Sequence, residues 1–218
     1  YGIIVGMILA VFVDRIILSS IILQILNIFG AFAVAVLIAA AESAFVLFLL
    51  SRSRTTSLRA SPPFGWALGL GIGSMQACVL IFRLFDQELA YSDYSGVNVI
   101  SLTLAIVIAL CSSLGHALLA CWQGAELLEN NRLRPYVVST VYRGALTTLL
   151  VLSLFTPFTL IAVLPGLALA WNKAQSNWLP SGMTPAAKQA YRRTTRQSER
   201  HKEASERRIR GEYVDSDE

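Results

Sequence analysis

Three polar side chains that could carry chemistry lie inside long apolar stretches of the sequence: Glu42, Gln76 and His116. Glutamate and histidine are residue types that hold a catalytic metal ion or move protons in acid–base catalysis. Ionisable groups at membrane depth are costly, and they usually mark buried pairs or functional sites. We therefore take Glu42 and His116 as candidate catalytic residues, and Gln76 as a third member of one polar cluster. The alternative is that each group bonds a neighbouring backbone group or a nearby serine, of which the sequence offers Ser43, Ser74, Ser112 and Ser113.

The composition indicates an integral membrane protein. Hydrophobic residues make up 55% of the 218 positions, and the mean hydropathy is +0.57 even though the C-terminal segment is almost entirely polar. The net charge of +4 arises in that segment, since residues 185–210 hold nine Lys/Arg against three Glu. A basic tail beside a membrane domain is typical of contact with anionic lipid headgroups, so we expect membrane lipids and no nucleic acid as contacts.

The fold class predicted from the apolar segments is all-α, a polytopic bundle of about six transmembrane helices. A crossing helix needs about 20 mostly apolar residues. The expected spans are residues 2–23, 29–50, 63–85 and 97–122, with a hairpin of two more spans over 136–172 that turns near Thr156-Pro157. We expect this bundle to occupy residues 1–175, and residues 176–218 to form a basic cytoplasmic tail that is helical from Thr184-Pro185 and then disordered. Because Tyr1 already lies in an apolar run, we expect the natural chain to start further upstream.

The charges of the loops predict an orientation. The loops after the second, fourth and sixth spans are basic, whereas the loop DQELAYSDYSG at 86–96 contains no Lys or Arg. Positively charged loops remain in the cytoplasm, so both termini of the visible chain should be cytoplasmic and the acidic loop should lie outside. Counting about 1.5 Å per residue from the cytoplasmic ends places Glu42 and His116 at a similar depth, with Gln76 one or two turns deeper.

Small and charged residues within the spans predict how the helices pack. Gly65, Gly69 and Gly73 recur every four residues and so leave one helical face without side chains, which lets another helix approach closely. Near the outer boundary, Asp14 could pair with the adjacent arginine or with Arg83. The other charged residues at this boundary are Arg15 and Asp86. The chain also has three cysteines, which we expect to be buried without binding metal: Cys78, Cys111 and Cys121.

The order of these elements resembles a known superfamily. A span with a glutamate and a basic loop (AAAESAFVLFLLSRSR), a glycine-rich span with an amide (GLGIGSMQA), a span ending in GHALLACWQG and a last hairpin follow one another over roughly residues 29–172. This order is similar to the PrsW and YhfC groups of predicted intramembrane proteases. The same superfamily includes the anterior-pharynx-defective scaffold subunit of gamma-secretase, whose corresponding span also carries a GxxxGxxxG pattern.

The match to the protease-like motifs is partial. Glu42 matches the first glutamate of a paired motif whose second position is Ser43 here, and His116 matches the third motif. Gln76 occupies a position that is a glutamate in the second motif, which is otherwise matched by Gly69, Gly71, Gly73 and Ala77. The fourth motif would place a histidine in the next span, where this chain has Tyr142 and no histidine. A metal-activated water needs about three protein ligands, and a neutral amide is a poor one.

The resemblance and its departures together imply a pseudoenzyme. We expect a non-catalytic scaffold subunit that packs on and stabilises a partner membrane protein, with the glycine face receiving a partner helix and no cofactor. One alternative is an intramembrane protease with a reduced site at Glu42 and His116, either zinc-dependent or of the glutamate type. Another is a small-molecule or ion carrier, because a buried glutamate and histidine can relay protons.

Overall fold

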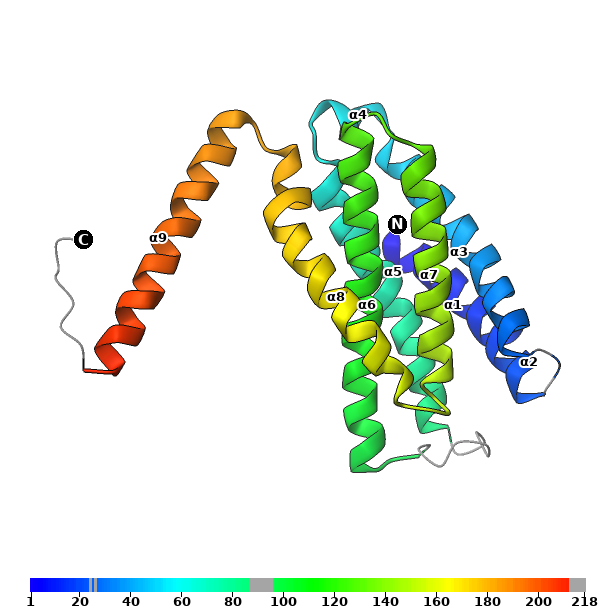
Figure 1. Cartoon of the computed structure of the whole chain (residues 1–218). Coiled ribbons are helices and arrows are strands. Elements are labelled where there is room, and N and C mark those ends of the chain that lie inside the picture. The colour runs from blue at the N-terminus through cyan, green and yellow to red at the C-terminus, as the bar shows by residue number, and fades with distance from the viewer. Residues whose placement is uncertain (24, 26, 87–95, 212–218) are drawn as a thin grey trace. The chain divides into compact units, whose positions relative to one another are not determined.

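The computed structural model describes residues 1–23, 25, 27–86 and 96–211, and this part of the chain is helical with short connecting turns (Figure 1). It divides into two units, residues 1–182 and residues 183–218. The described part contains no strand. The predicted all-α fold class is therefore confirmed.

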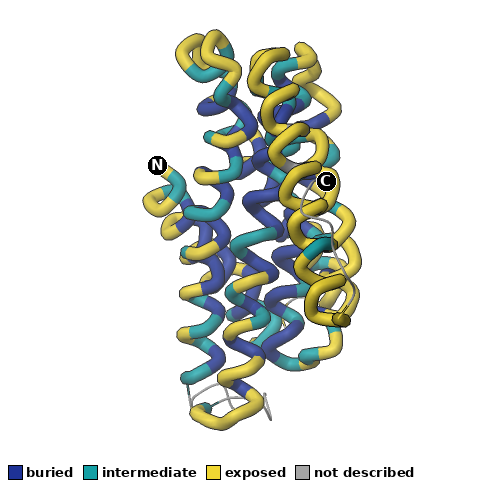
Figure 2. Tube along the Cα trace, turned by 90° about the vertical axis from the view of Figure 1, so that its left-hand side faces the viewer, coloured by how far each residue is buried: buried dark blue, intermediate teal, exposed yellow. Residues whose placement is uncertain are grey.

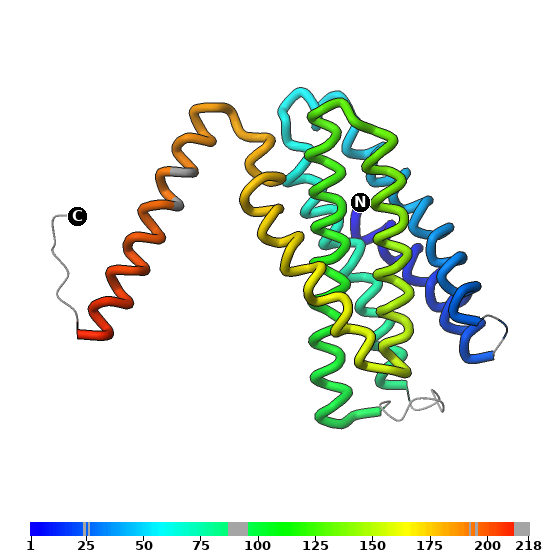
Figure 3. Tube along the Cα trace, in the orientation of Figure 1, coloured from blue at the N-terminus to red at the C-terminus, as the bar shows by residue number. Residues whose placement is uncertain are grey.

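The first unit is a bundle whose course Figure 3 traces from blue to orange. In chain order its elements are α1 (Gly2–Phe12), the π-helix η1 (Val13–Leu18), α2 (Ser19–Ile22), α3 (Ile28–Leu50), α4 (Ser53–Ser57), α5 (Ser61–Phe85), α6 (Val99–Leu128), α7 (Leu133–Leu152), α8 (Thr159–Lys173), the π-helix η2 (Ala174–Trp178) and the 3₁₀ turn η3 (Leu179–Gly182). The second unit consists of α9 (Pro185–Ile209) and the residues around it.

In the described part of the chain, five helical segments are long and apolar enough to cross a membrane. They are Gly2–Ile22, Ile28–Leu50, Ser61–Phe85, Val99–Leu128 and Leu133–Leu152. Each coincides with a predicted span, which makes the chain a multi-pass integral membrane protein. The sixth predicted span differs: α8 has only 15 residues and contains Pro165. The turn at Thr156-Pro157 lies between α7 and α8 as predicted.

Local sequence signals set the helix starts. Asn27 caps α3 by accepting a hydrogen bond from the Gly30 backbone nitrogen at 2.8 Å, and Asn98 forms a capping box with Ser101 at the start of α6. Prolines lie in the first turn of α5, where the missing N–H carries no penalty. The acidic loop at 86–96 was predicted to lie on the outer side of the membrane. Most of it, residues 87–95, lies outside the described residues.

The glycine face of α5 packs on α6 of the same chain. A methyl group at Gly65, Gly69 or Gly73 would overlap backbone atoms of α6. Ser112 of α6 adds a hydrogen bond to the Gly73 carbonyl oxygen at 2.7 Å. The expectation that this face receives a partner helix is therefore wrong, because α6 already occupies it; the spacing predicted close packing but not the identity of the second helix.

Another face of α5 receives α1. Gly6 of α1 lies against the backbone of Ile72, and Gly71 of α5 lies against the backbone of Gly2. The buried core residues accordingly line the inner sides of the helices, as the dark segments of Figure 2 show. Cys111 and Cys121 are buried as predicted, whereas Cys78 is exposed on the outer side of α5.

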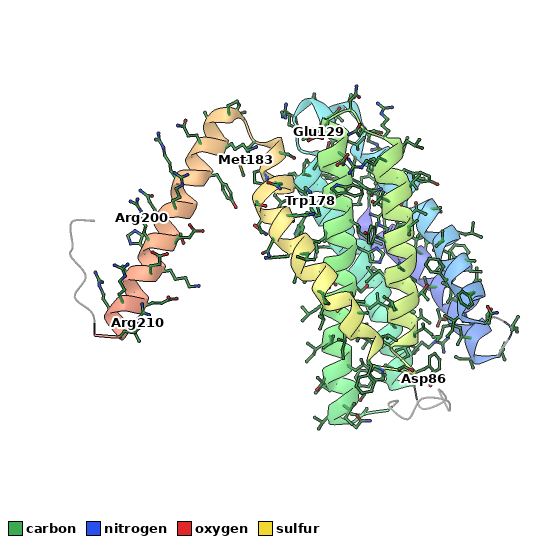
Figure 4. All side chains as sticks on the ribbon, in the orientation of Figure 1. Asp86, Glu129, Trp178, Met183, Arg200 and Arg210 are labelled. Atoms are coloured by element: carbon green, nitrogen blue, oxygen red, sulfur yellow. The ribbon has the colours of Figure 1, made fainter. Side chains whose placement is uncertain are left out.

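The two ends of the first unit carry different charges. Asp86 and Glu129, labelled in Figure 4, lie at opposite ends of the bundle. The end near Glu129 carries most of the basic residues of this unit: Arg52, Arg54, Arg59, Arg132, Arg134 and Lys173. The side to which this end faces stays a prediction from the loop charges.

The tail forms the helix that its sequence predicts. α9 begins after Thr184, whose side chain accepts a hydrogen bond from the Ala187 backbone nitrogen at 3.3 Å. Its described side chains are mostly exposed, as befits a basic, solvated helix. The acidic segment expected to be disordered, 212–218, lies outside the described residues.

Replacing Gly69 with alanine should destabilise the bundle, because the added methyl group overlaps the His116 carbonyl oxygen and a backbone atom cannot move aside cheaply. We expect a loss of about 1–3 kcal/mol, the usual effect of overpacking. Thermal unfolding in detergent micelles measures it. Gly166→Ala is the matched control, since no described atom lies within 4 Å of its added methyl group. Equal melting of Gly69→Ala and the unmodified chain would contradict the close packing.

Candidate functional site

Glu42 and His116 are in direct contact inside the bundle. Nδ1 of His116 on α6 lies 2.7 Å from Oε1 of Glu42 on α3, and both side chains are fully buried. A carboxylate only accepts hydrogen bonds, so the imidazole hydrogen is placed on Nδ1. Nε2 of His116 then has no hydrogen-bond partner among the described residues.

A third helix contributes an arginine to this contact. Nε of Arg143 on α7 lies 3.2 Å from the same Oε1 of Glu42, although it is not aligned for a hydrogen bond. Nη1 of Arg143 donates to Oγ of Ser43 at 3.0 Å. Arg143 is 0% exposed, so its positive charge and the carboxylate of Glu42 neutralise each other in the interior. With His116 neutral, the cluster of Glu42, Ser43, His116 and Arg143, called here the buried ion-pair cluster, carries no net charge.

Close helix packing brings this cluster together. Gly144, next to Arg143, lies against the backbone of Val36, so α7 and α3 run in close contact there. On the other side, His116 lies on the segment of α6 that packs against Gly69 of α5. The side chain of His116 thus points to α3 while its carbonyl oxygen faces α5.

Gln76 does not join the buried ion-pair cluster. It is 2% exposed, and neither its amide oxygen nor its amide nitrogen has a hydrogen-bond partner within the described part of the chain. The nearby serines are engaged elsewhere: Ser112 donates to the Gly73 carbonyl, and Ser74 bonds Ser113 at 3.1 Å. Of the expected hydrogen-bonded triad, the structure shows the bond between Glu42 and His116 but no bond of Gln76 to either residue.

The charged residues near the other end of the bundle form a separate pair. Arg83 holds Asp14 with two contacts, Nε to Oδ1 at 2.6 Å and Nη2 to Oδ2 at 2.8 Å. It also contacts Asp86 at 3.3 Å. Asp14 lies in the π-helix η1, which widens the first span at that point. Arg15 is 3.8 Å from Asp14 and mostly exposed, so Arg83 is the principal partner.

The cluster is a poor zinc site. Glu42 and His116 could supply two ligands, but no third histidine, cysteine or carboxylate joins them among the described residues. Their neighbour is the guanidinium of Arg143, whose fixed positive charge repels a metal cation. The donor set therefore does not fit zinc.

The cluster is also sealed. Glu42, His116 and Arg143 are each at most 1% exposed, and they line neither the groove beneath α8 nor the one beside the end of α3. Acid–base chemistry requires a substrate atom within hydrogen-bond reach of the base. What the arrangement does physically is to join α3, α6 and α7 through one neutralised contact.

Arg143 is not among the site residues predicted from the sequence. The signal was present: Arg143 is a lone cation in the run VVSTVYRGALTTLL. A single charge within a span predicts a buried partner of opposite sign, and Glu42 is the unpaired anion of another span. The buried hydroxyl residues Thr140 and Thr147 on the same helix face mark that side of α7 as polar.

Removing Arg143 should be strongly destabilising, because Glu42 would be left as an uncompensated buried charge. For Arg143→Met we expect a loss of about 3–5 kcal/mol. The double variant Glu42→Gln/Arg143→Met should recover much of that loss, and a double-mutant cycle of thermal unfolding in micelles gives the coupling. Arg54→Met removes an exposed arginine and serves as the control. A cycle without coupling would show that the two groups do not interact.

Replacing Gln76 with methionine should stabilise the bundle, because two buried polar atoms without partners are exchanged for apolar atoms at similar volume. An unsatisfied buried group costs about 1–3 kcal/mol, so a rise in melting temperature is expected. Gln76→Glu, which introduces the acidic residue type of the motif that the sequence resembles, should instead lower it. A lower melting temperature for Gln76→Met would mean that the amide has an important partner.

Comparison with known proteins gives no family assignment. No protein-family model matches the chain, and no curated protein or solved structure matches it either. The resemblance to the PrsW and YhfC groups and to the gamma-secretase scaffold subunit stays a prediction, carried by the order of short motifs.

Proposed function

We propose that this chain is a non-catalytic integral membrane subunit that packs on a partner membrane protein and stabilises it. The observation that carries the proposal is the contact between Glu42 and Arg143, in which a buried carboxylate lies 3.2 Å from a fully buried guanidinium that neutralises it. In this proposal Glu42 stabilises the fold. It occupies a glutamate position of the protease-like motif but has no catalytic role.

We place the partner contact on α8, because the rest of the bundle covers little of this helix. Only Leu160 and Val163 of its 15 residues are buried. Its two ends are nevertheless fixed, at the start by these residues and near the end by Trp171, whose ring meets that of Trp66 on α5 edge to face at 5.6 Å. Leu164 and Ala168 lie one turn apart on the exposed side, where a second helix can pack by van der Waals contact.

The test is extraction of the tagged chain from its own cells in mild detergent, followed by identification of the membrane proteins that remain bound. Leu164→Trp/Ala168→Trp keeps the face apolar but blocks close helix contact, so we expect the bound protein to be lost. Ile4→Trp/Ile8→Trp places the same bulk on exposed positions of α1 and should retain it. Retention by the α8 variant at the level of the control would refute the placement on α8.

The intramembrane protease is the competing hypothesis, and Glu42→Gln separates the two. A scaffold should keep its partner when Glu42→Gln is folded, and the partner's own processing activity should be unchanged. Loss of processing with the partner still bound would instead assign chemistry to Glu42. Absence of any stoichiometric membrane protein after extraction would overturn the scaffold proposal itself.

A further inference from the structure

An open groove of about 660 Å³ lies between α6, α7 and α8, and no residue of the buried ion-pair cluster lines it. Its walls are mainly apolar, and include Leu119, Leu146, Leu149, Val163 and Leu167. The volume falls within the range of roughly 300–1,000 Å³ that is typical of small-molecule sites. Gly166 faces open space, since no described atom lies within 4 Å of where its side chain would begin.

The groove exists because α8 is held at its two ends and crosses α6 obliquely (Figure 1). Leu160 and Val163 are buried at the start of α8. Beyond its end, Ala174 is buried and Trp171 packs on Trp66. Between these ends Leu167 packs against the core, whereas Gly166 has no described atom within 4 Å of an added methyl group. The space beneath α8 is therefore part of the fold and does not need to be opened by a ligand.

One end of the groove is cationic. Arg134, in the first turn of α7, and Lys173, at the end of α8, both line it, together with Trp122 and Trp178. The nearest acid is Glu126, whose Oε2 is 3.9 Å from Arg134. Its two oxygens also accept from Trp122 and Asn131. Lys173 has no ion pair within the described residues, so this end keeps a net positive charge.

We propose that the groove binds one anionic phospholipid, with an acyl chain along the apolar walls and the phosphate between Arg134 and Lys173. The cationic end lies at the end of the bundle that also carries Arg52, Arg54, Arg59 and Arg132, where headgroups of a bilayer would lie. Tryptophan is enriched at that level of a membrane, because its ring is apolar and its N–H is polar. The charge of the site matches an anionic headgroup and gives no advantage to a zwitterionic one.

The experiment uses the purified full chain in detergent, titrated with phosphatidylglycerol or with phosphatidylcholine of the same acyl chains. Bound lipid is counted by native mass spectrometry. We expect a single preferred phosphatidylglycerol and markedly weaker phosphatidylcholine binding. Neutralising both cations in Arg134→Gln/Lys173→Gln should weaken phosphatidylglycerol binding about thirtyfold, at about tenfold for each 1.4 kcal/mol and roughly 1 kcal/mol per cation.

Two controls separate the groove from general attraction to a basic surface. Arg54→Gln/Arg132→Gln removes two charges that do not line this groove and should leave the preference intact. Gly166→Phe should fill the groove and abolish the preferred site with both cations present, whereas Gly166→Ala should retain it. Melting curves identify any variant that is unfolded.

Three results would each overturn the proposal: equal binding of the two lipids, an equal loss in Arg54→Gln/Arg132→Gln, or full preference retained in Gly166→Phe. If the groove received a protein helix instead of a lipid, it would not select among lipids, and the two lipids would bind equally. The assay contains no partner protein, so its outcome is independent of the scaffold proposal.

Discussion

The structure depends on the neutralisation of Glu42 by Arg143 in an apolar interior. An isolated carboxylate at membrane depth is too costly to be retained without a partner, and so is an isolated guanidinium. Both are fully buried here, 3.2 Å apart, with His116 on the same carboxylate oxygen. α3 and the consecutive pair α6 and α7 must therefore meet at this depth, and the rotations of these three helices about their own axes are restricted by the same contact.

The close packing at the glycines extends this restriction to two further helices, α5 and α1. His116 contributes its imidazole to the contact with Glu42 and its carbonyl oxygen to the surface on which Gly69 lies. α6 is thus the common element of two interfaces, one electrostatic with α3 and one of close backbone packing with α5. α1 in turn packs on α5 through Gly2 and Gly6. The polar contact fixes the register of the bundle, while the glycines fix its helix separations.

The sequence predicts well what depends on length and spacing. The first five spans follow from apolar length, the turn before α8 from Thr156-Pro157, and close packing of α5 from its glycines. What packs on those glycines does not follow, since the same spacing serves an internal helix and a partner helix equally. The partner of Glu42 was predictable in kind, from the lone Arg143, but the lack of a hydrogen-bonded neighbour for Gln76 in the described structure was not. That outcome depends on the rotation of α5, which side-chain spacing alone does not determine.

The groove between α6, α7 and α8 could not be predicted from the sequence either, because it arises from the oblique course of α8 and not from a sequence motif. α8 crosses α6 obliquely (Figure 1), and it is supported at its start by Leu160 and Val163 and near its end by Trp171. Glu42 and His116 are buried in the interior, whereas the groove with its cationic end and the outer face of α8 are accessible. Both proposals involve α8. Its inner side forms a wall of the proposed lipid site, and its outer side is the proposed contact with a partner protein. A lipid in the groove would therefore support the helix that the partner contacts.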